Sequence, residues 1–516
     1  MTRDAAWGRL AEPLDLLVIG GGVTGAGILL EAARRGLRVA LVERGDFASG
    51  TSSRSSKLVH GGLRYLGEGR IGLARESVRE RELLLRCAPG LVEPMPFLMP
   101  HYPGGKPGRR ALGAGLAAYD LLAGRRTHRY VDRAEALRLA PPIASDGLEG
   151  AHVYEDATTD DARLVLRLIA DACDAGAVAL NYAEAVELLR YGNRVVGAVV
   201  RETVGGERTV VASARAVINA TGAFADGVRA RVGAAPRLRP LRGSHLLFSD
   251  ARLPLAMAVA FAHPRDRRPV FAYPWAGMTL LGTTDLDHGD SLAAEPTITA
   301  EEVDYLLDAA NAEFPRSALG RDDVLSTFAG VRPVIGTGKT DPSKEGREHA
   351  IWIEDGLVTV TGGKLTTFRP MALDALHAAA RAAGLQLGSR ARAPFAAAPA
   401  PRAEAPAATL RRIAGRYGAR AQRVVAAGLP GEFADVAGIE ATWAELRWAA
   451  RSEAVVRLDD LLLRRTRIGL RHGDATLPVA RVRAICAEEL HWKAEHWERE
   501  YAAYRELRSA HYGLPA

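Results

Sequence analysis

Cysteine is scarce in this sequence, with three residues among 516: Cys87, Cys173 and Cys486. They are far apart and form no CxxC pair, which argues against a disulfide framework and against a zinc or iron–sulfur site. We therefore expect free thiols in a reducing compartment and no metal site.

Long apolar runs are also missing. The longest near the N-terminus, Leu16–Leu30, is interrupted by glycines and is shorter than the ~20 apolar residues of a membrane-spanning helix. The first residues, "MTRDAAWGRLAEPLD", contain acids and no continuous apolar core, so we expect no secretory signal. The net charge is +7, but the basic residues are dispersed and no nucleic-acid-binding motif accompanies them, so we expect no nucleic-acid partner.

The N-terminal stretch "LDLLVIGGGVTGAGILLEAARRGLRVALVERG" predicts a βαβ unit. It indicates a strand over Leu14–Ile19, a helix that ends near Gly36 and a second strand over Arg38–Val42. The turn after the first strand holds the glycines of GxGxxG, namely Gly20, Gly22 and Gly25. This spacing allows a tight turn and the close approach of a pyrophosphate to the helix N-terminus, and Glu43 is placed to bind a ribose.

The strand that ends in Asn219–Gly222 resembles the second dinucleotide-contact motif of FAD-binding folds of the glutathione-reductase type, with Ala220 and Gly222 against the cofactor. No second GxGxxG with its own βαβ context follows, so a separate NAD(P)H domain is not expected. One tightly bound FAD is the cofactor that remains. A helix expected from about Leu365, after Gly362 and Gly363, could direct its positive end toward the flavin.

The remaining patterns divide the chain into parts. Short strands and a helix with a capping box at Thr299–Glu302 predict a substrate-binding sheet. The expected fold class is α/β: a Rossmann-like FAD-binding domain of the glutathione-reductase type, a β-rich substrate domain and an all-helical C-terminal domain. The predicted limits are 1–235 and 351–387 for the FAD-binding domain, 236–350 for the substrate domain, 388–408 for an Ala/Pro linker and 409–516 for the helical domain.

Several short motifs follow in order along the chain, and the most specific is "TSSRSSKLVHGGLRYL". The others are "RGSHLLF", "YPW", "GTTD", "GVRP", "GGKLTTFR" and "DDLLLRRTRIG". In this order they resemble the FAD-dependent, respiratory glycerol-3-phosphate dehydrogenases, a family of D-amino-acid-oxidase-like flavoproteins. The resemblance covers about residues 14 to 475. It implies oxidation of sn-glycerol 3-phosphate to dihydroxyacetone phosphate, with hydride transfer to FAD and electrons passed to membrane quinone.

A phosphate dianion in a closed site requires fixed cations, and a secondary alcohol requires a group that takes its proton. We expect Arg332, Lys364 and Arg64 to hold the substrate. His245 is the first candidate for the base and His60 the second, whereas Arg332 is an alternative that would stabilise the alkoxide. Tyr65 would orient the substrate or close the site, and Thr284 with Asp285 would support the sheet.

The stretch Thr51–Ser56 brings small hydroxyl residues beside the dinucleotide motif, and we expect Ser52 and Ser53 to contact FAD, as well as Gly363 and Lys364. Gly61 and Gly62 would leave room for the flavin ring.

Residues 100–130 place basic clusters on both sides of a small apolar centre, which is typical of a segment that lies on an anionic membrane surface. The expected location is cytoplasmic, peripheral to the inner face of the cell membrane. A soluble helix with a basic face is the alternative. The sequence does not decide between a monomer and a homo-oligomer.

Three other functions remain open. A glycerol-3-phosphate oxidase would use the same site with O2 as acceptor and release H2O2. A flavin enzyme for another 2-hydroxy acid or an amine is disfavoured by the cations. A non-catalytic FAD-binding interaction protein is disfavoured by the joint presence of His245, Arg332 and Lys364.

Overall fold

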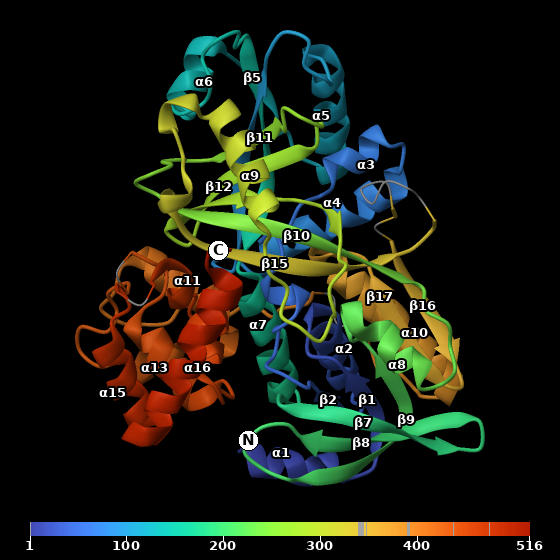
Figure 1. Ribbon diagram of the computed structural model, residues 1–516. Coiled ribbons are helices and arrows are strands. Elements are labelled where there is room, and N and C mark those ends of the chain that lie inside the picture. The colour runs from blue at the N-terminus through green and yellow to red at the C-terminus, as the bar shows by residue number, and fades with distance from the viewer. Residues whose placement is uncertain are drawn as a thin grey trace.

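Two sheets and a group of C-terminal helices make up the computed structural model, as Figure 1 shows. The structure describes residues 2–338, 345–346, 348–389, 393–436, 438–473 and 475–515. The expected fold class is confirmed: a mixed α/β chain with a helical C-terminal part. Within the described residues, no helix combines the length and the apolar composition needed to cross a bilayer.

The first sheet has eight strands, with the order β16-β17-β9-β1-β2-β6 and the β7–β8 hairpin attached beside β9. β17, β9, β1, β2 and β6 run parallel, so their carboxyl ends lie at one edge. The strands are β1 (Leu14–Ile19), β2 (Val39–Val42), β6 (Val178–Leu180), β7 (Ala183–Tyr191), β8 (Arg194–Glu202), β9 (Thr209–Asn219), β16 (His349–Glu354) and β17 (Leu357–Gly362). The strands predicted at Leu14–Ile19, at Arg38–Val42 and before Asn219–Gly222 are present, and the second begins at Val39.

Side chains of β1 are buried on both faces of this sheet. Leu16 and Val18 pack among α2 (Val23–Ala33), α7 (Asp161–Asp174) and α10 (Phe368–Ala383). Leu17 points the other way, toward α1 (Arg3–Leu10) and the β7–β8 hairpin. Because neighbouring side chains in a strand alternate between faces, a strand covered on both sides reads as continuously apolar, as β1 does.

The second sheet has nine strands, with the order β14-β10-β13-β12-β11-β3-β5-β4 and β15 beside β10. Its strands are β3 (Val92–His101), β4 (Arg129–Asp132), β5 (Gly150–Thr159), β10 (Leu238–Ser249), β11 (Ala258–Ala262), β12 (Pro269–Trp275), β13 (Met278–Gly282), β14 (Leu286–Asp287) and β15 (Val324–Ile335). Its helices are α5 (Arg109–Ala123), α6 (Arg133–Leu139) and α9 (Ala300–Glu313), at the top of Figure 1. The capping box predicted for α9 is present, since Thr299 Oγ1 accepts from Glu302 N and Glu302 accepts from Thr299 N.

The strands of residues 92–159 pair within the second sheet, although the sequence placed them in the first domain. β3 bonds to both β5 and β11, and such long-range pairing leaves no local signal in the sequence. The predicted domain limits stay predictions. Residues 339–344, 347 and 390–392, which fall in the predicted substrate domain and linker, lie outside the described residues.

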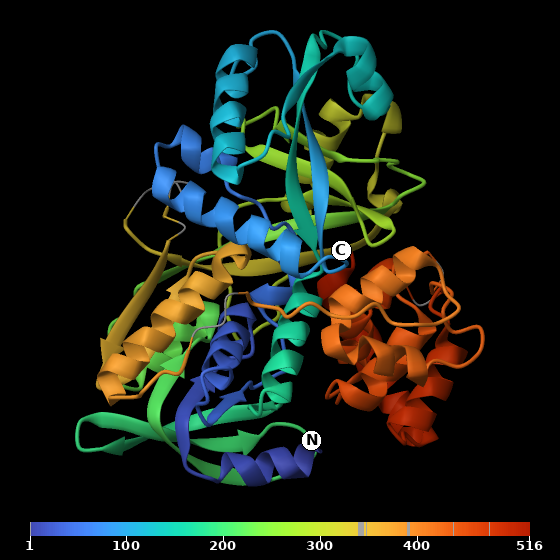
Figure 2. The ribbon, with the colours of Figure 1, turned by 180° about the vertical axis from the view of Figure 1, so that it is seen from behind.

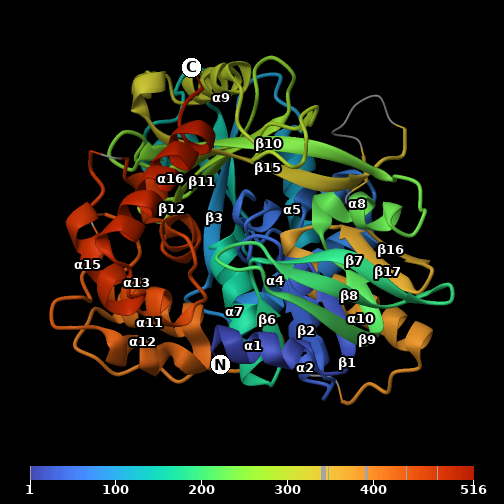
Figure 3. The ribbon, with the colours of Figure 1, turned by 60° about the horizontal axis from the view of Figure 1, so that its bottom comes forward.

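The C-terminal helices lie beside both sheets, at the lower left of Figure 1 and on the left of Figure 3. Figure 2 shows the chain crossing from α10 to reach them. Phe395 is the one aromatic residue of the predicted linker. It is buried in the core of the first sheet, so the linker packs against that core. The helices are α11 (Ala407–Tyr417), α12 (Ala421–Ala427), α13 (Trp443–Ser452), α14 (Ile468–Arg471), α15 (Val479–Glu489) and α16 (Ala494–Tyr512), with a π-helical turn at Asp460–Arg465.

Three further helices lie near the site. They are α3 (Leu63–Gly67), α4 (Ile71–Cys87) and α8 (Ala225–Ala230). α10 is preceded by a 3-10 turn at Leu365–Thr367, so the helix predicted from about Leu365 begins as that turn.

Candidate functional site

The glycine turn after β1 packs tightly against backbone atoms at Gly20 and Gly25. A Cβ at Gly25 would lie 1.9 Å from the carbonyl oxygen of Gly20, and one at Gly20 would lie 2.6 Å from that of Ala220. Gly20 has φ +113°, a conformation that side chains strongly disfavour. Gly22 is the N-cap of α2, and a Cβ there would lie 3.1 Å from Ser52 Oγ. Because the turn carries no side chains, an anion can approach the N-terminus of α2, where Ser52 Oγ already accepts from the Val23 amide.

Glu43 follows β2 at the same sheet edge. Its carboxylate accepts hydrogen bonds from Gly21 N (2.7 Å) and Gly45 N (2.9 Å), which orients it toward the turn. Burial raises the pKa of Glu43, and the two amide groups oppose that rise. This is the geometry expected of an acid that binds a ribose diol.

A cavity of about 580 Å³ runs along the carboxyl ends of β1, β2, β9 and β17. Its lining includes the predicted residues Gly20, Gly22, Glu43, Ser52, Ala220, Gly222, Gly363 and Lys364. Seven predicted residues do not line it: Gly25 packs under the turn, the Ser53 hydroxyl turns to Gly50 O, and His60, Arg64, Tyr65, His245 and Arg332 lie outside its lining. Parallel sheets bind ligands at this edge because their strand ends and helix N-termini meet there.

The residues present fit FAD. Glycine atoms form the cradle, and a Cβ at Gly363 would lie 2.3 Å from Met371 Sδ. Arg44, which sequence analysis missed, places its guanidinium 4.0 Å from the centre of the Phe224 ring, and both line the cavity. Gly22, Glu43 and Arg44 would hold the adenosine and phosphates, and Gly363 with Lys364 would lie at the flavin end.

The hydroxyl stretch is built into this cavity wall. Ser52 Oγ accepts from Val23 N (2.9 Å) at the start of α2, and Thr51 Oγ1 donates to Val331 O in β15. The stretch thus joins the dinucleotide turn to the second sheet, which explains its small side chains.

Lys364 and Tyr65 form a cluster at one end of the cavity. Lys364 Nζ is buried without a hydrogen-bond partner and lies 4.3 Å from the centre of the Tyr65 ring. Burial lowers the pKa of Lys364 to about 7, although Asp156 and Glu76 act to raise it. His60 adjoins this cluster: burial, then Lys364 and Arg64, lower its pKa to about 3.

Arg64 also acts on His60 but has an exposed side chain. Its side chain is 47% exposed and pairs with Glu68 at 2.8 Å. The structure therefore brings Lys364, Tyr65 and His60 together, whereas Arg64 contributes positive charge from the protein surface.

His245 belongs to a second cluster, on the strands β10 and β15. Its Nε2 atom lies 2.8 Å from Ser56 Oγ, and its ring stacks on Phe328 with centroids 4.6 Å apart. His245 Nδ1 is buried without a hydrogen-bond partner. Burial, together with Arg332 and Lys57, holds the pKa of His245 well below its usual range, so the ring is neutral.

Arg332 is held by the loop after β13. It donates to Asp285 Oδ1 (2.8 Å) and to Thr283 Oγ1 (3.1 Å), and its side chain is 26% exposed. Thr284 donates to Glu302 (2.6 Å) and accepts from Ser244 N, as expected for a residue that supports the sheet.

Residues 56–60 connect the His245 cluster to the Lys364 cluster. Ser56 contacts His245, and His60 O accepts from Thr366, two residues after Lys364.

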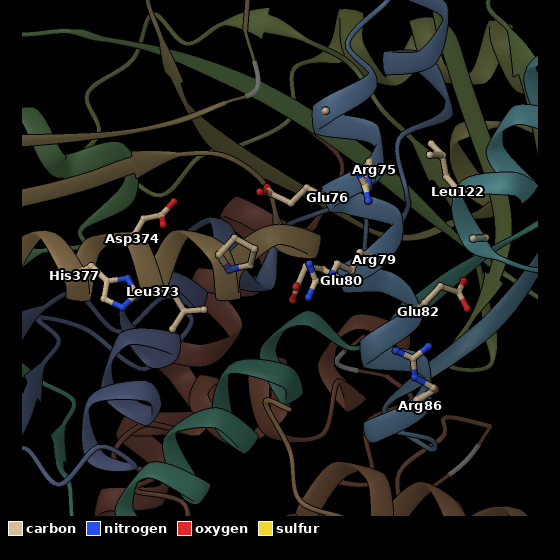
Figure 4. A pocket seen from close by; sticks show the side chains of 13 residues that line it. Arg75, Glu76, Arg79, Glu80, Glu82, Arg86, Leu122, Leu373, Asp374 and His377 are labelled. Carbon is tan, nitrogen blue, oxygen red and sulfur yellow. The ribbon is translucent and has the colours of Figure 1, made fainter. Parts of the chain in front are cut away.

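A larger hollow of about 720 Å³ lies between α4, α10 and the end of α5, as Figure 4 shows. Charged side chains of both signs line it, including Arg75, Glu76, Arg79 and Glu80. None of the predicted site residues lines this hollow, and the glycine cradle is elsewhere. We therefore assign the site to the smaller cavity.

Sequence analysis missed three buried aspartates that shape the site. Asp156 accepts from Gly61 N, Arg81 and Tyr119, and thereby holds the backbone that precedes α3. Asp161 accepts from Ser55 and Lys57, and Asp46 from Arg464 and Arg465. Acids at the end of an apolar strand and the start of a helix, as in "YEDATTDDARL", are the signal that could have found the first two.

Two family profiles match the chain. One, described as FAD dependent oxidoreductase, matches residues 15–369, and the other, described as C-terminal domain of alpha-glycerophosphate oxidase, matches residues 382–497. The first covers more than half of the chain.

Curated relatives carry the name aerobic glycerol-3-phosphate dehydrogenase. The one from Staphylococcus epidermidis is 41% identical over 367 residues, and the one from Staphylococcus aureus is 40% identical over 370. Each alignment covers 70% of this chain and 66% of the relative. The chain thus aligns with slightly less than two thirds of the length of these relatives.

Two solved structures are also similar to this chain. The glycerol-3-phosphate dehydrogenase from Bacillus halodurans, complexed with FAD, is 30% identical with a TM-score of 0.75, over 98% of this chain and 97% of that one. The L-alpha-glycerophosphate oxidase from Mycoplasma pneumoniae shares the fold, at 19% identity and a TM-score of 0.58 over 73% of this chain and 97% of that one. The resemblance of the motifs is confirmed: the chain belongs to the FAD-dependent oxidoreductases and, within them, to the glycerol-3-phosphate dehydrogenase family.

Proposed function

We propose that this protein oxidises sn-glycerol 3-phosphate to dihydroxyacetone phosphate. The observation that carries the proposal is the buried, unpartnered Nζ of Lys364 at the flavin end of the cavity. A buried ammonium without a partner is costly, so the arrangement favours an anionic ligand. The relatives named glycerol-3-phosphate dehydrogenase support this substrate.

FAD, when bound, accepts the hydride from the carbinol carbon. In this proposal Lys364 and Arg332 hold the anionic substrate, with Arg64 adding positive charge from the protein surface. Tyr65 lies against Lys364 and limits where the substrate can sit.

His245 is the proposed base. In the tautomer whose Nε2–H donates to Ser56 Oγ, Nδ1 has a free lone pair and can take the hydroxyl proton. A neutral ring is needed for this step, and burial keeps His245 neutral. His60 is also neutral and is the second candidate, and stabilisation of the alkoxide by Arg332 is the alternative to a histidine base.

The proposed acceptor of the electrons is a membrane quinone, with attachment through α5 at the inner face of the cell membrane. The exposed residues of α5 and its flanks support this: Lys106, Arg109, Arg110, Ala111, Ala114, Ala117, Ala118, Leu121 and Arg126. Leu121 is 83% exposed. A small apolar stripe between basic ends suits the headgroup region of an anionic bilayer.

The test is anaerobic addition of sn-glycerol 3-phosphate to the holoenzyme while the absorbance of oxidised flavin is followed. We expect rapid bleaching, and recovery of the absorbance on addition of a quinone. No bleaching would contradict the proposed function. Recovery with oxygen alone, with H2O2 in step with turnover, would instead identify an oxidase.

A further inference from the structure

Arg467 of the C-terminal part lies in the core of the FAD-binding part. It directly precedes α14, is 3% exposed and has φ +64°. Its Nη2 atom donates to Asp160 Oδ1 (2.7 Å) and to Asp161 Oδ1 (2.6 Å), the two acids at the start of α7. One guanidinium therefore ties the C-terminal helices to that helix N-terminus.

Asp161 in turn holds the hydroxyl stretch. Its Oδ2 atom accepts from Ser55 N (3.0 Å) and from Ser55 Oγ (2.7 Å), and Lys57 Nζ lies 3.0 Å from Oδ1. Lys57 also donates to Ser53 O (2.8 Å). Two residues of the stretch, Ser55 and Lys57, thus bind this carboxylate, and Lys57 in turn holds Ser53.

Ser56 lies between these anchored residues and contacts His245. The Lys57 ammonium lies 4.6 Å from the centre of the Phe328 ring, on which His245 also stacks. The position of His245 is therefore set by Ser56 and by a ring that Lys57 contacts. A displacement of residues 55–57 would change both contacts.

The charges in this buried site balance. Asp160 and Asp161 carry two negative charges, and Arg467 and Lys57 carry two positive charges, all on side chains that are at most 7% exposed. Removal of the guanidinium leaves a carboxylate uncompensated, and such a group either recruits another partner or draws water into the site. Such a change would displace Lys57 and Ser55, which are the nearest hydrogen-bond donors.

We propose that Arg467 is a positioning residue for the oxidation: through Asp161 it holds Ser55–Lys57 so that Ser56 orients His245. This inference rests on the proposed function in one respect, which is that His245 takes part in the reaction. It assigns the C-terminal helices a part in the chemistry, although none of their described residues lines the cavity.

The test uses the holoenzyme with Arg467→Gly. Glycine adopts a positive φ without strain, so this variant keeps the backbone and leaves a space that a free guanidinium ion can enter. The matched control is Glu453→Gln. Glu453 makes a largely buried ion pair across the same interface, to Arg163 (2.6 Å), and forms no hydrogen bond or ion pair with residues 51–57.

Two quantities are measured. One is the hydrogen–deuterium exchange of the segment 51–59, which contains the Ser55 amide that Asp161 binds. The other is the rate of anaerobic flavin reduction at saturating sn-glycerol 3-phosphate. In Arg467→Gly we expect faster exchange in this segment and a rate lower by on the order of 10- to 100-fold. Guanidinium chloride at millimolar concentration should restore both, and NaCl should not. Glu453→Gln should change neither.

Several results would overturn the inference: unchanged exchange, faster exchange with an unchanged rate, or the same changes in Glu453→Gln. If sn-glycerol 3-phosphate fails to bleach the wild-type flavin, the proposed function is wrong, and exchange with and without guanidinium still decides whether Arg467 holds the stretch. If Arg467→Gly does not fold, Arg467→Lys replaces it. This variant keeps the charge but cannot bridge both aspartates, and we expect intermediate exchange and rate.

Discussion

The ammonium nitrogen of Lys364 lies over the face of the Tyr65 ring, 4.3 Å from the ring centre, and has no hydrogen-bond partner. An aromatic face attracts a cation but does not satisfy its three donors. The pair is therefore poised for an anion that supplies oxygen acceptors.

The first prediction is a loss of substrate affinity as the pH rises through 7. Burial lowers the pKa of Lys364 to about 7, so the ammonium is present below that pH and disappears above it. Because only the charged form attracts the phosphate, kcat/KM should fall by up to about tenfold per pH unit between pH 7 and 9. Arg at this position stays charged, so Lys364→Arg should flatten the profile. A wild-type profile that is flat over this range would remove Lys364 from substrate binding.

The second prediction concerns proton removal. His245→Ala should lower the rate of flavin reduction by roughly two to four orders of magnitude, because the hydroxyl proton loses its acceptor. Stopped-flow absorbance under anaerobic conditions measures this rate. FAD content and chemical reduction by dithionite should be unchanged. If the rate with substrate is also unchanged, His245 has no part in the reaction.

The third prediction is that Gly25→Ala abolishes FAD binding. The new methyl group would lie 1.9 Å from Gly20 O, so α2 must move away from the turn, at a cost of about 1–3 kcal/mol. The FAD-to-protein absorbance ratio and the melting temperature report the two effects. Gly72→Ala is the control, because no atom beyond its chain neighbours and its own helix backbone lies within 4 Å of the added methyl group. Full FAD occupancy in Gly25→Ala would show that the turn is more adaptable than its contacts indicate.

The fourth prediction concerns the membrane. Leu121→Ser should weaken binding to anionic liposomes, because it removes the largest exposed apolar side chain of α5. Tyr191→Ser is the matched control: Tyr191 is also 83% exposed, but it lies at the tip of the β7–β8 hairpin. Sedimentation at low salt measures both. Equal retention of the two variants, or no sedimentation of the wild type, would argue against attachment through α5.

The dinucleotide-binding part of the site was predicted from the sequence because its residues lie close together along the chain. The glycines and Glu43 lie within one βαβ unit, where spacing alone determines which residues meet at the strand ends. It did not assign a role to Asp161, because the donors that this aspartate serves lie about 100 and 300 residues away in the chain. The pairing of β3 with β11 was missed for the same reason.

The sequence by itself determined the cofactor class, the βαβ unit and the family, since these depend on motifs whose order and spacing are visible along the chain. Only the tertiary structure decided that Ser53 turns away from the cavity, that Arg64 pairs at the surface and that Arg467 reaches Asp161. The physical reason is that the direction of a side chain depends on which partners folding brings near it. A buried charge must find a partner wherever the chain supplies one, and no periodicity in the sequence records that choice.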